Sequence, residues 1–259
     1  MCSTIALRYN EGVARTGVVE GAGVALAYEA VGPPEGPAVV LVHDMAADAR
    51  TWAPVAEHLE GRVIAYDRRG YGGSGAPEPY SATTVSEQAE DLAALMAGLD
   101  TAPALLVGEG FGALVVLDVL SRHRAAVRGA VLVDPPLFAF VPEATEELSA
   151  RRAEMEGAVR AGGPGEAVAT WLGAAAEPGR VARARDNARP FFADLGGLAT
   201  LSLTRAGLRA IGVPVVVLTG PATAPSVRMA ADRVQGLLSG AVRADDGDVA
   251  AALSALAAR

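Results

Sequence analysis

Two carboxylates follow apolar strands in positions that would suit proton-transfer chemistry. Asp44 comes after the run Ala38–His43, and Glu109 stands between two glycines after the run Ala104–Val107. The carboxyl ends of parallel strands meet at one edge of a sheet, where ligands bind. A carboxylate can act there as a general acid or base when burial raises its pKa toward neutrality. We predict Asp44 and Glu109 as catalytic groups, and His43 as a third candidate because imidazole titrates near neutral pH.

The composition excludes several other kinds of chemistry. The 259 residues carry 22 basic and 30 acidic side chains, a net charge of −8, which argues against a nucleic-acid partner. Every basic residue is an arginine, so no lysine can form a Schiff base. The single cysteine, Cys2, leaves no internal disulfide and no cysteine cluster for a metal. We expect neither a metal nor a cofactor, and a small molecule as the partner.

Hydropathy gives no sign of a membrane segment. No apolar run approaches the ~20 residues that a membrane-spanning helix needs, and Met1–Gly12 lacks the apolar core of a signal peptide. We expect a cytoplasmic protein with a sizeable core, since 51% of its residues are hydrophobic. The oligomeric state is left open.

Strands and helices alternate along most of the chain, which predicts a layered α/β domain with a mostly parallel sheet. An N-terminal hairpin is expected from Gly12–Glu20 and Val24–Ala30. The remaining strands are predicted at Ala38–His43, Val63–Tyr66, Ala104–Val107, Ala130–Val133, Val213–Leu218 and, more weakly, Ala241–Arg243.

Helical patterns occupy the intervals between these strands. Thr84 and Glu87 form a capping box that predicts a helix start, and a second helix is expected after Gly112. Between 137 and 209 no strand is expected, only helical segments such as Glu143–Arg160 and Gly165–Ala176. We interpret 137–209 as a helical lid inserted into a core formed by 1–136 and 210–259.

Three motifs in a fixed order resemble the α/β-hydrolase superfamily of the compact, lidded type. They are Leu-Val-His-Asp-Met at 41–45, Tyr-Asp-Arg-Arg-Gly-Tyr-Gly-Gly-Ser-Gly at 66–75 and Val-Gly-Glu-Gly-Phe-Gly-Ala at 107–113. The resemblance covers nearly the whole chain from about Val24. It implies an α/β-hydrolase fold with a sharp strand-to-helix turn at the third motif.

The same resemblance implies a serine, acid and histidine triad, and this chain lacks all three. Gly110 stands at the nucleophile position, between Gly108 and Gly112. No carboxylate follows Val215–Gly220, where the acid is expected. The last loop reads Ala-Asp-Asp-Gly-Asp at 244–248 and holds no histidine. Acyl-enzyme chemistry through Gly110 is therefore not available.

Asp44 is a further departure, because the family commonly has glycine after this histidine. The backbone N–H groups that follow serve the family as donors to an oxyanion. Two negative charges about 4 Å apart repel by roughly 4 kcal/mol at an effective dielectric of 20. An ionised Asp44 facing the pocket would therefore oppose a tetrahedral oxyanion.

Each candidate also has a structural interpretation. Asp44 could cap the next helix, and Glu109 could be a buried, hydrogen-bonded structural residue, as in many esterases. In the family the histidine at His43 usually braces the loop. Arg68 could pair with a ligand carboxylate, but an ion-paired turn is favoured for it, as a solvated acidic turn is favoured for 245–248.

A pocket is expected between lid and sheet, over Gly110. We predict that the substrate-binding residues are Met45, Gly110, Phe111, Phe138 and Phe140. Trp171 and the pair Phe191-Phe192 are assigned to the core of the lid itself.

Three functions remain open at this point. The favoured one is a cofactor-independent, non-hydrolytic enzyme of the cyclase, isomerase or lyase type. It would act on a small, largely apolar metabolite in specialised, natural-product metabolism such as polyketide biosynthesis, with a carboxylate moving a proton. The first alternative is a non-catalytic small-molecule binding protein derived from a hydrolase. The second is a hydrolase that uses a carboxylate-activated water. Dinucleotide binding through Gly108, Gly110 and Ala113 is disfavoured, because several strands precede this fingerprint.

Overall fold

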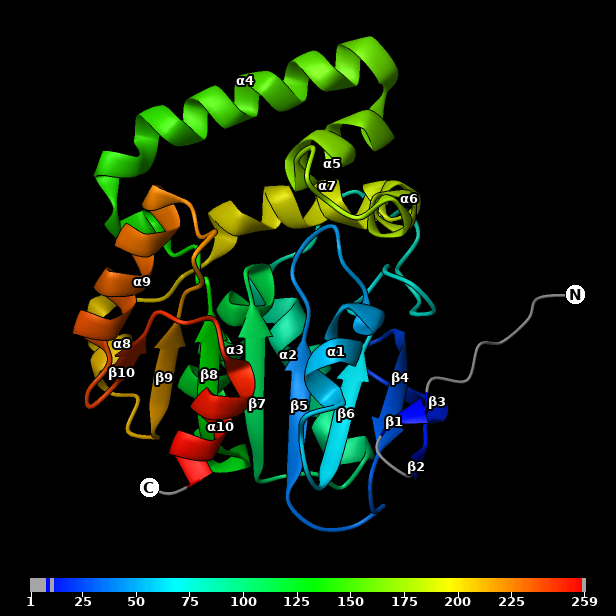
Figure 1. The fold of residues 1–259 in the computed structure, drawn as a ribbon, viewed down its shortest axis with the longest axis vertical. Helices are drawn as coiled ribbons and strands as arrows, with labels where there is room; N and C mark the ends of the chain where they lie inside the picture. Colours follow the sequence, from blue (N-terminus) through cyan, green and yellow to red (C-terminus); the bar gives the residue numbers. More distant parts are fainter. Residues whose placement is uncertain (1–7, 10–11, 258–259) are drawn as a thin grey trace, which may run out of the picture.

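An eight-stranded sheet forms the middle layer of the computed structural model, which describes residues 8–9 and 12–257 (Figure 1). The strand order is β10-β9-β8-β7-β5-β6-β4-β3. Strands β5 to β10 run parallel, while β4 pairs antiparallel with both β6 and β3. The strands are β3 (Arg15–Glu20), β4 (Ala25–Val31), β5 (Ala38–Val42), β6 (Arg62–Tyr66), β7 (Ala104–Glu109), β8 (Val127–Val133), β9 (Val215–Leu218) and β10 (Val242–Ala244). The predicted α/β fold class is confirmed.

Helices cover both faces of this sheet. Two buried apolar clusters separate the layers, one beneath α1 and α10 and the other beneath α2, α3 and α9. The α-helices are α1 (Ala53–Ala56), α2 (Val85–Gly98), α3 (Phe111–Arg122), α4 (Thr145–Gly162), α5 (Pro164–Leu172), α6 (Pro178–Asp186), α7 (Ala188–Gly197), α8 (Arg205–Arg209), α9 (Pro225–Leu237) and α10 (Val249–Ala257). Short 3-10 helices span Ala49–Trp52, Arg124–Ala126, Phe138–Phe140, Pro142–Ala144 and Leu198–Thr200.

The central strands form where the sequence has continuous apolar runs, because both faces of these strands are covered. The predicted capping box is present: the Thr84 hydroxyl accepts from the Glu87 N–H, and the Glu87 carboxylate accepts from the Thr84 N–H. The N-terminal hairpin differs from its prediction. Its first run divides into β3 and the short β2 (Gly12–Val13), which pairs with β1 (Arg8–Tyr9) instead of β4.

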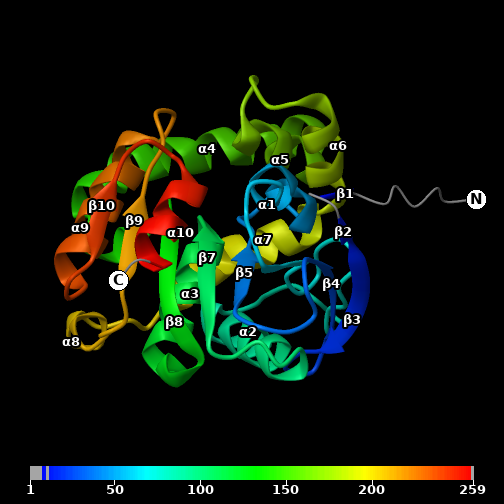
Figure 2. The same cartoon turned by 60° about the horizontal axis from the view of Figure 1, so that its bottom comes forward.

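Helices α4 to α7 lie across the edge of the sheet where the parallel strands end (Figure 1). The segment predicted as Glu143–Arg160 is α4, and the one predicted as Gly165–Ala176 is α5, which ends earlier at Leu172. Figure 2 places α8 away from α4, beside the core, where it contacts α9. In the part of the chain that the structure describes, no helix is both long and apolar enough to cross a membrane.

Candidate functional site

The turn between β7 and α3 has the tight geometry that its glycines predict. Gly110 adopts a φ of 53° and a ψ of −118°, a backbone conformation that residues with a Cβ atom rarely adopt. A Cβ at Gly108 would overlap the backbone of Gly112, and a Cβ at Gly112 would overlap the carbonyl oxygens of Val42 and His43. Glycine is therefore required for backbone approach at 108 and 112, and it adopts the strained conformation at 110 without the penalty that a Cβ would add.

Asp44 fills the space above Gly110. A Cβ built on Gly110 would overlap Oδ1, Cγ and Oδ2 of Asp44. The carboxylate thus stands where a nucleophilic side chain at position 110 would begin. The absence of a nucleophile and the presence of Asp44 are consequently two aspects of one arrangement.

Two backbone N–H groups hold the Asp44 carboxylate in this place. The Phe111 N–H, at the start of α3, donates to Oδ1 at 2.7 Å, and the Met45 N–H adds a weaker interaction. These positions correspond to the two donors of the family's oxyanion hole. Asp44 therefore occupies that hole from within the chain. Burial nevertheless outweighs both donors and raises the pKa of Asp44 above its ordinary value.

Glu109 lies beside Asp44 and is the most perturbed acid of the site. Burial first, and then the charge of Asp44, raise the pKa of Glu109 to about 7, against a weaker opposing effect of Arg180. Within the described chain no donor is hydrogen-bonded to the Glu109 carboxylate. With a pKa near 7 this side chain can both give and take a proton at neutral pH.

His43 is fully buried, and backbone groups use both of its ring nitrogens. Nδ1 donates to the Asp44 carbonyl at 2.7 Å, while Nε2 accepts from the Arg68 N–H at 3.0 Å. Burial and the Arg68 charge hold the pKa of His43 well below its usual value. The neutral ring braces the loop that carries Asp44, and it has no free nitrogen through which to serve the catalytic role predicted for it.

A buried polar network connects α7 of the lid with α2 and with the turn after β6, which carries Arg68. The Arg68 guanidinium donates to the Asp194 carboxylate of α7 at 2.7 Å and to Gln88 of α2 at 2.6 Å. Asp194 also accepts from the Tyr71 hydroxyl and from the Gln88 amide, each at 2.6 Å. Arg68 is thus part of an ion-paired turn, as favoured from the sequence, while Asp194 was not predicted. The one signal for Asp194 is a lone carboxylate in the run Phe191–Leu195, which is otherwise apolar.

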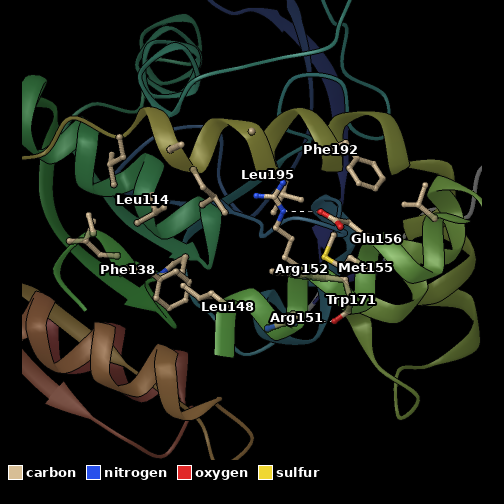
Figure 3. Close-up of a pocket in the computed structure, with 18 residues that line it drawn as sticks. Leu114, Phe138, Leu148, Arg151, Arg152, Met155, Glu156, Trp171, Phe192 and Leu195 are labelled. Atoms are coloured by element: carbon tan, nitrogen blue, oxygen red, sulfur yellow. Dashed lines mark hydrogen bonds and ion pairs between the residues drawn. The ribbon is translucent and has the colours of Figure 1, made fainter. Parts of the chain in front are cut away.

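The largest apolar cavity lies between the lid helices and the loop after β8 (Figure 3). We call it the lid cavity. Its volume is about 710 Å³, which is within the range of small-molecule sites. Its walls are mainly hydrophobic, with three charged residues among them. The lining residues are Leu114, Pro136, Leu137, Phe138, Ala139, Leu148, Arg151, Arg152, Met155, Glu156, Val159, Trp171, Phe192, Leu195, Gly196, Leu198, Ala199 and Leu201.

The position of this cavity corrects the sequence-based expectation of a pocket over Gly110. Phe138 lines the lid cavity, but Met45, Gly110 and Phe111 do not, and neither carboxylate does. The reason is that Asp44 fills the space over Gly110, while the side chains of Met45 and Phe111 are packed into the core.

Phe140 and the lid aromatics also differ in part from expectation. Phe140 borders a separate, smaller hollow, where the guanidinium of Arg205 lies 5.4 Å from its ring centre. Phe191 packs edge-on against Trp171 and Phe192 and is fully buried, as expected of a lid core. Trp171 and Phe192 in addition line the lid cavity, which the sequence did not indicate.

The loops that would carry the acid and the histidine of a triad hold a structural ion-pair cluster instead. Asp245 accepts from the Thr219 hydroxyl at 2.7 Å and pairs with Arg243 at 2.8 Å. Asp248 accepts from the Ala251 N–H and so caps α10. Within the described residues, no group of three or more histidine, cysteine, aspartate and glutamate side chains is arranged to hold a metal ion.

Comparison with known proteins identifies the family to which this chain belongs. A model described as the alpha/beta hydrolase family matches residues 39–255. The uncharacterized hydrolase YraK of Bacillus subtilis is 32% identical over 105 residues, which make up 40% of this chain and 39% of that protein.

Solved structures share the fold of this protein over nearly the whole chain. A hydrolase from Pseudomonas aeruginosa superposes with a TM-score of 0.71 at 23% identity, over 91% of each chain. A thermophilic esterase from Thermogutta terrifontis superposes with a TM-score of 0.69 at 26% identity, over 90% of each chain. The stretch matched by the family model includes both Asp44 and Glu109.

Proposed function

Because this chain belongs to the alpha/beta hydrolase family but has glycine at the position of the nucleophile, we propose that it is a non-hydrolytic enzyme that moves protons on its substrate. Its substrate is a small, largely apolar metabolite, and the reaction is an isomerisation, cyclisation or elimination that needs no cofactor. The observation that carries this proposal is the pair of adjacent carboxylates, of which Glu109 has a pKa of about 7.

The two carboxylates have distinct tasks in this proposal. Burial raises the pKa of Asp44 despite the hydrogen bonds from Phe111 and Met45, and a raised pKa makes a carboxylate a stronger base, so Asp44 takes a proton from the substrate. Glu109, whose pKa is raised to about 7, acts as the acid that returns a proton at another atom. His43 and Arg68 position the Asp44 loop and do not take part in the transfer.

The lid cavity holds the apolar body of the substrate in this account. Asp44 and Glu109 do not line it, but both residues, although largely enclosed, keep a small exposed fraction. Arg151, which does line it, lies close enough to Asp44 for the Asp44 charge to stabilise the guanidinium. A substrate in the cavity would therefore extend its reactive end toward the carboxylates.

A deletion strain tests the proposal. Metabolites of the source organism are compared with those of a strain that lacks the gene, complemented by the wild type, Asp44→Asn or Glu109→Gln. Loss of a general acid or base lowers turnover by about 10²- to 10⁴-fold. In the deletion strain we expect one compound to accumulate and its product to be lost. Of these three genes, only the wild type should restore the product. The matched control, Glu57→Gln, alters an exposed carboxylate and should restore conversion fully. Unchanged metabolites on deletion, or full rescue by both amides, would overturn the proposal.

A second candidate is a small-molecule binding protein, and two observations favour it. Asp44 accepts from the Phe111 N–H, a donor of the family's oxyanion hole, and neither carboxylate lines the cavity. Under this alternative the amide variants change only affinity, and no conversion is lost on deletion. Hydrolysis by an activated water is separated by a panel of activated esters. Sustained ester turnover that disappears in Asp44→Asn or Glu109→Gln would favour that third function.

A further inference from the structure

Arg151 differs from the two buried arginines of this protein in its partners. Arg68 and Arg69 are buried, and each forms an ion pair with a buried carboxylate, Asp194 and Asp91 respectively. Arg151 faces the lid cavity, yet it forms no ion pair with any carboxylate that the structure describes. Removing a guanidinium from water without a partner is unfavourable, so a site of this kind favours an anion that completes it.

Trp171 holds the Arg151 guanidinium at the cavity wall. The guanidinium carbon lies 3.7 Å from the Trp171 ring centre, and Nη2 donates to the Trp171 carbonyl at 3.2 Å. Stacking leaves the edge of a guanidinium free for hydrogen bonds, and only one of its N–H groups is used here. In Figure 3 Arg151 and Trp171 lie together, on the side of the cavity away from Phe192 and Leu195 of α7.

The other charged groups of the cavity are already satisfied. Arg152 pairs with Glu156 at 2.9 Å, one turn along α4, and both side chains are exposed. Most of the remaining lining is hydrophobic, including Phe138, Leu148 and Met155. The cavity therefore combines a large apolar volume with one partly enclosed cation that forms no direct ion pair within the described residues.

We propose that the lid cavity binds an apolar molecule bearing a single carboxylate, with Arg151 as the group that pairs with that carboxylate. The inference rests on the proposed function, because it names the class of its substrate. The inference adds to the proposed function that Arg151 of α4 pairs with the anionic end of the substrate.

Binding of matched probes to the full chain tests this assignment by calorimetry. The probes are dodecanoate and 2-naphthoate, each compared with its methyl ester, which has the same apolar body and no charge. A charge-assisted hydrogen-bonded pair is worth about tenfold or more in affinity. We expect each acid to bind at least about tenfold more tightly than its ester to the wild type, and equally tightly to Arg151→Met.

Two further variants keep the test independent of folding defects. Arg151→Lys retains the charge and should keep part of the preference for the acid. Arg160→Met removes an exposed arginine of the same helix that does not line the cavity, and it should keep all of it. Equal binding of acid and ester to the wild type, the same preference in Arg151→Met, or no binding of any probe would overturn the assignment. Because the assay measures binding alone, acids that bind without any metabolite being converted in the deletion test would refute the proposed function and leave this assignment standing.

Discussion

The carboxylate of Asp44 occupies the volume into which any side chain at Gly110 would project. It also accepts the Phe111 N–H that, in the family, awaits the oxyanion of a substrate. One substitution thus accounts for two features of the site. A nucleophile cannot be accommodated, and the donors for a tetrahedral intermediate are already engaged by an internal carboxylate.

Gly110→Ser should therefore destabilise the protein as long as Asp44 is present. The added side chain overlaps the carboxylate, and overpacking of this kind costs about 1–3 kcal/mol of unfolding free energy. In an Asp44→Ala background the overlap is gone, so the same substitution should cost less. The strain of the positive φ is common to both backgrounds and cancels in the comparison.

Urea unfolding of the four proteins gives this coupling as a double-mutant cycle. Gly236→Ser serves as the control, because no atom lies within 4 Å of a Cβ at that position, and its effect should be the same in both backgrounds. Equal costs of Gly110→Ser with and without Asp44 would show that the two residues do not compete for space.

Glu109 should make the protein less stable as the pH rises. Its pKa of about 7 in the folded chain exceeds the ordinary value of 4.5, so the folded state binds more protons between these two values. Stability attributable to this group is therefore greatest below pH 4.5, falls as the pH rises toward 7 and is constant above that. The difference between wild type and Glu109→Gln, measured by urea unfolding across this interval, isolates the effect from other carboxylates. A difference that is independent of pH contradicts the raised pKa.

Asp194 should be essential to the attachment of the lid. Removing it in Asp194→Ala leaves the fully buried Arg68 without its counter-charge, which costs about 3–5 kcal/mol. The variant should also bind cavity ligands more weakly, because Asp194 holds α7, which contributes Phe192 and Leu195 to the cavity. Asp186→Ala, which removes an exposed carboxylate of α6, should be nearly neutral. If Asp194→Ala lowers the free energy of unfolding by less than about 1 kcal/mol, Asp194 is not the main group that stabilises the buried Arg68 charge.

The sequence predicts those parts of the molecule that depend on local pattern. Continuous apolar runs locate the central strands because both of their faces are buried, and the capping box locates the start of α2. Gly108 and Gly112 indicate a tight turn because no side chain fits there. The position of Asp44 at a strand end follows from the same pattern.

What the sequence does not predict depends on tertiary contacts. The orientation of Asp44 into the Phe111 and Met45 donors requires knowledge of how β5 and α3 meet. One wall of the lid cavity is formed by α4, whose sequence is so rich in charged residues and alanine that periodicity does not indicate which face is turned inward. Phe111 was assigned to the substrate from its position beside Gly110, but its ring is packed into the core.

The central claim is that burial and the charge of Asp44 poise Glu109 near neutral pH, and the direct measurement is a ¹³C NMR titration of the Glu109 carboxyl carbon. In the wild type we predict a midpoint near pH 7. In Asp44→Asn the midpoint should be lower, because one negative charge is removed, yet should remain above 4.5 because burial is the larger cause. A wild-type midpoint close to 4.5, or one that Asp44→Asn leaves unchanged, would contradict the account.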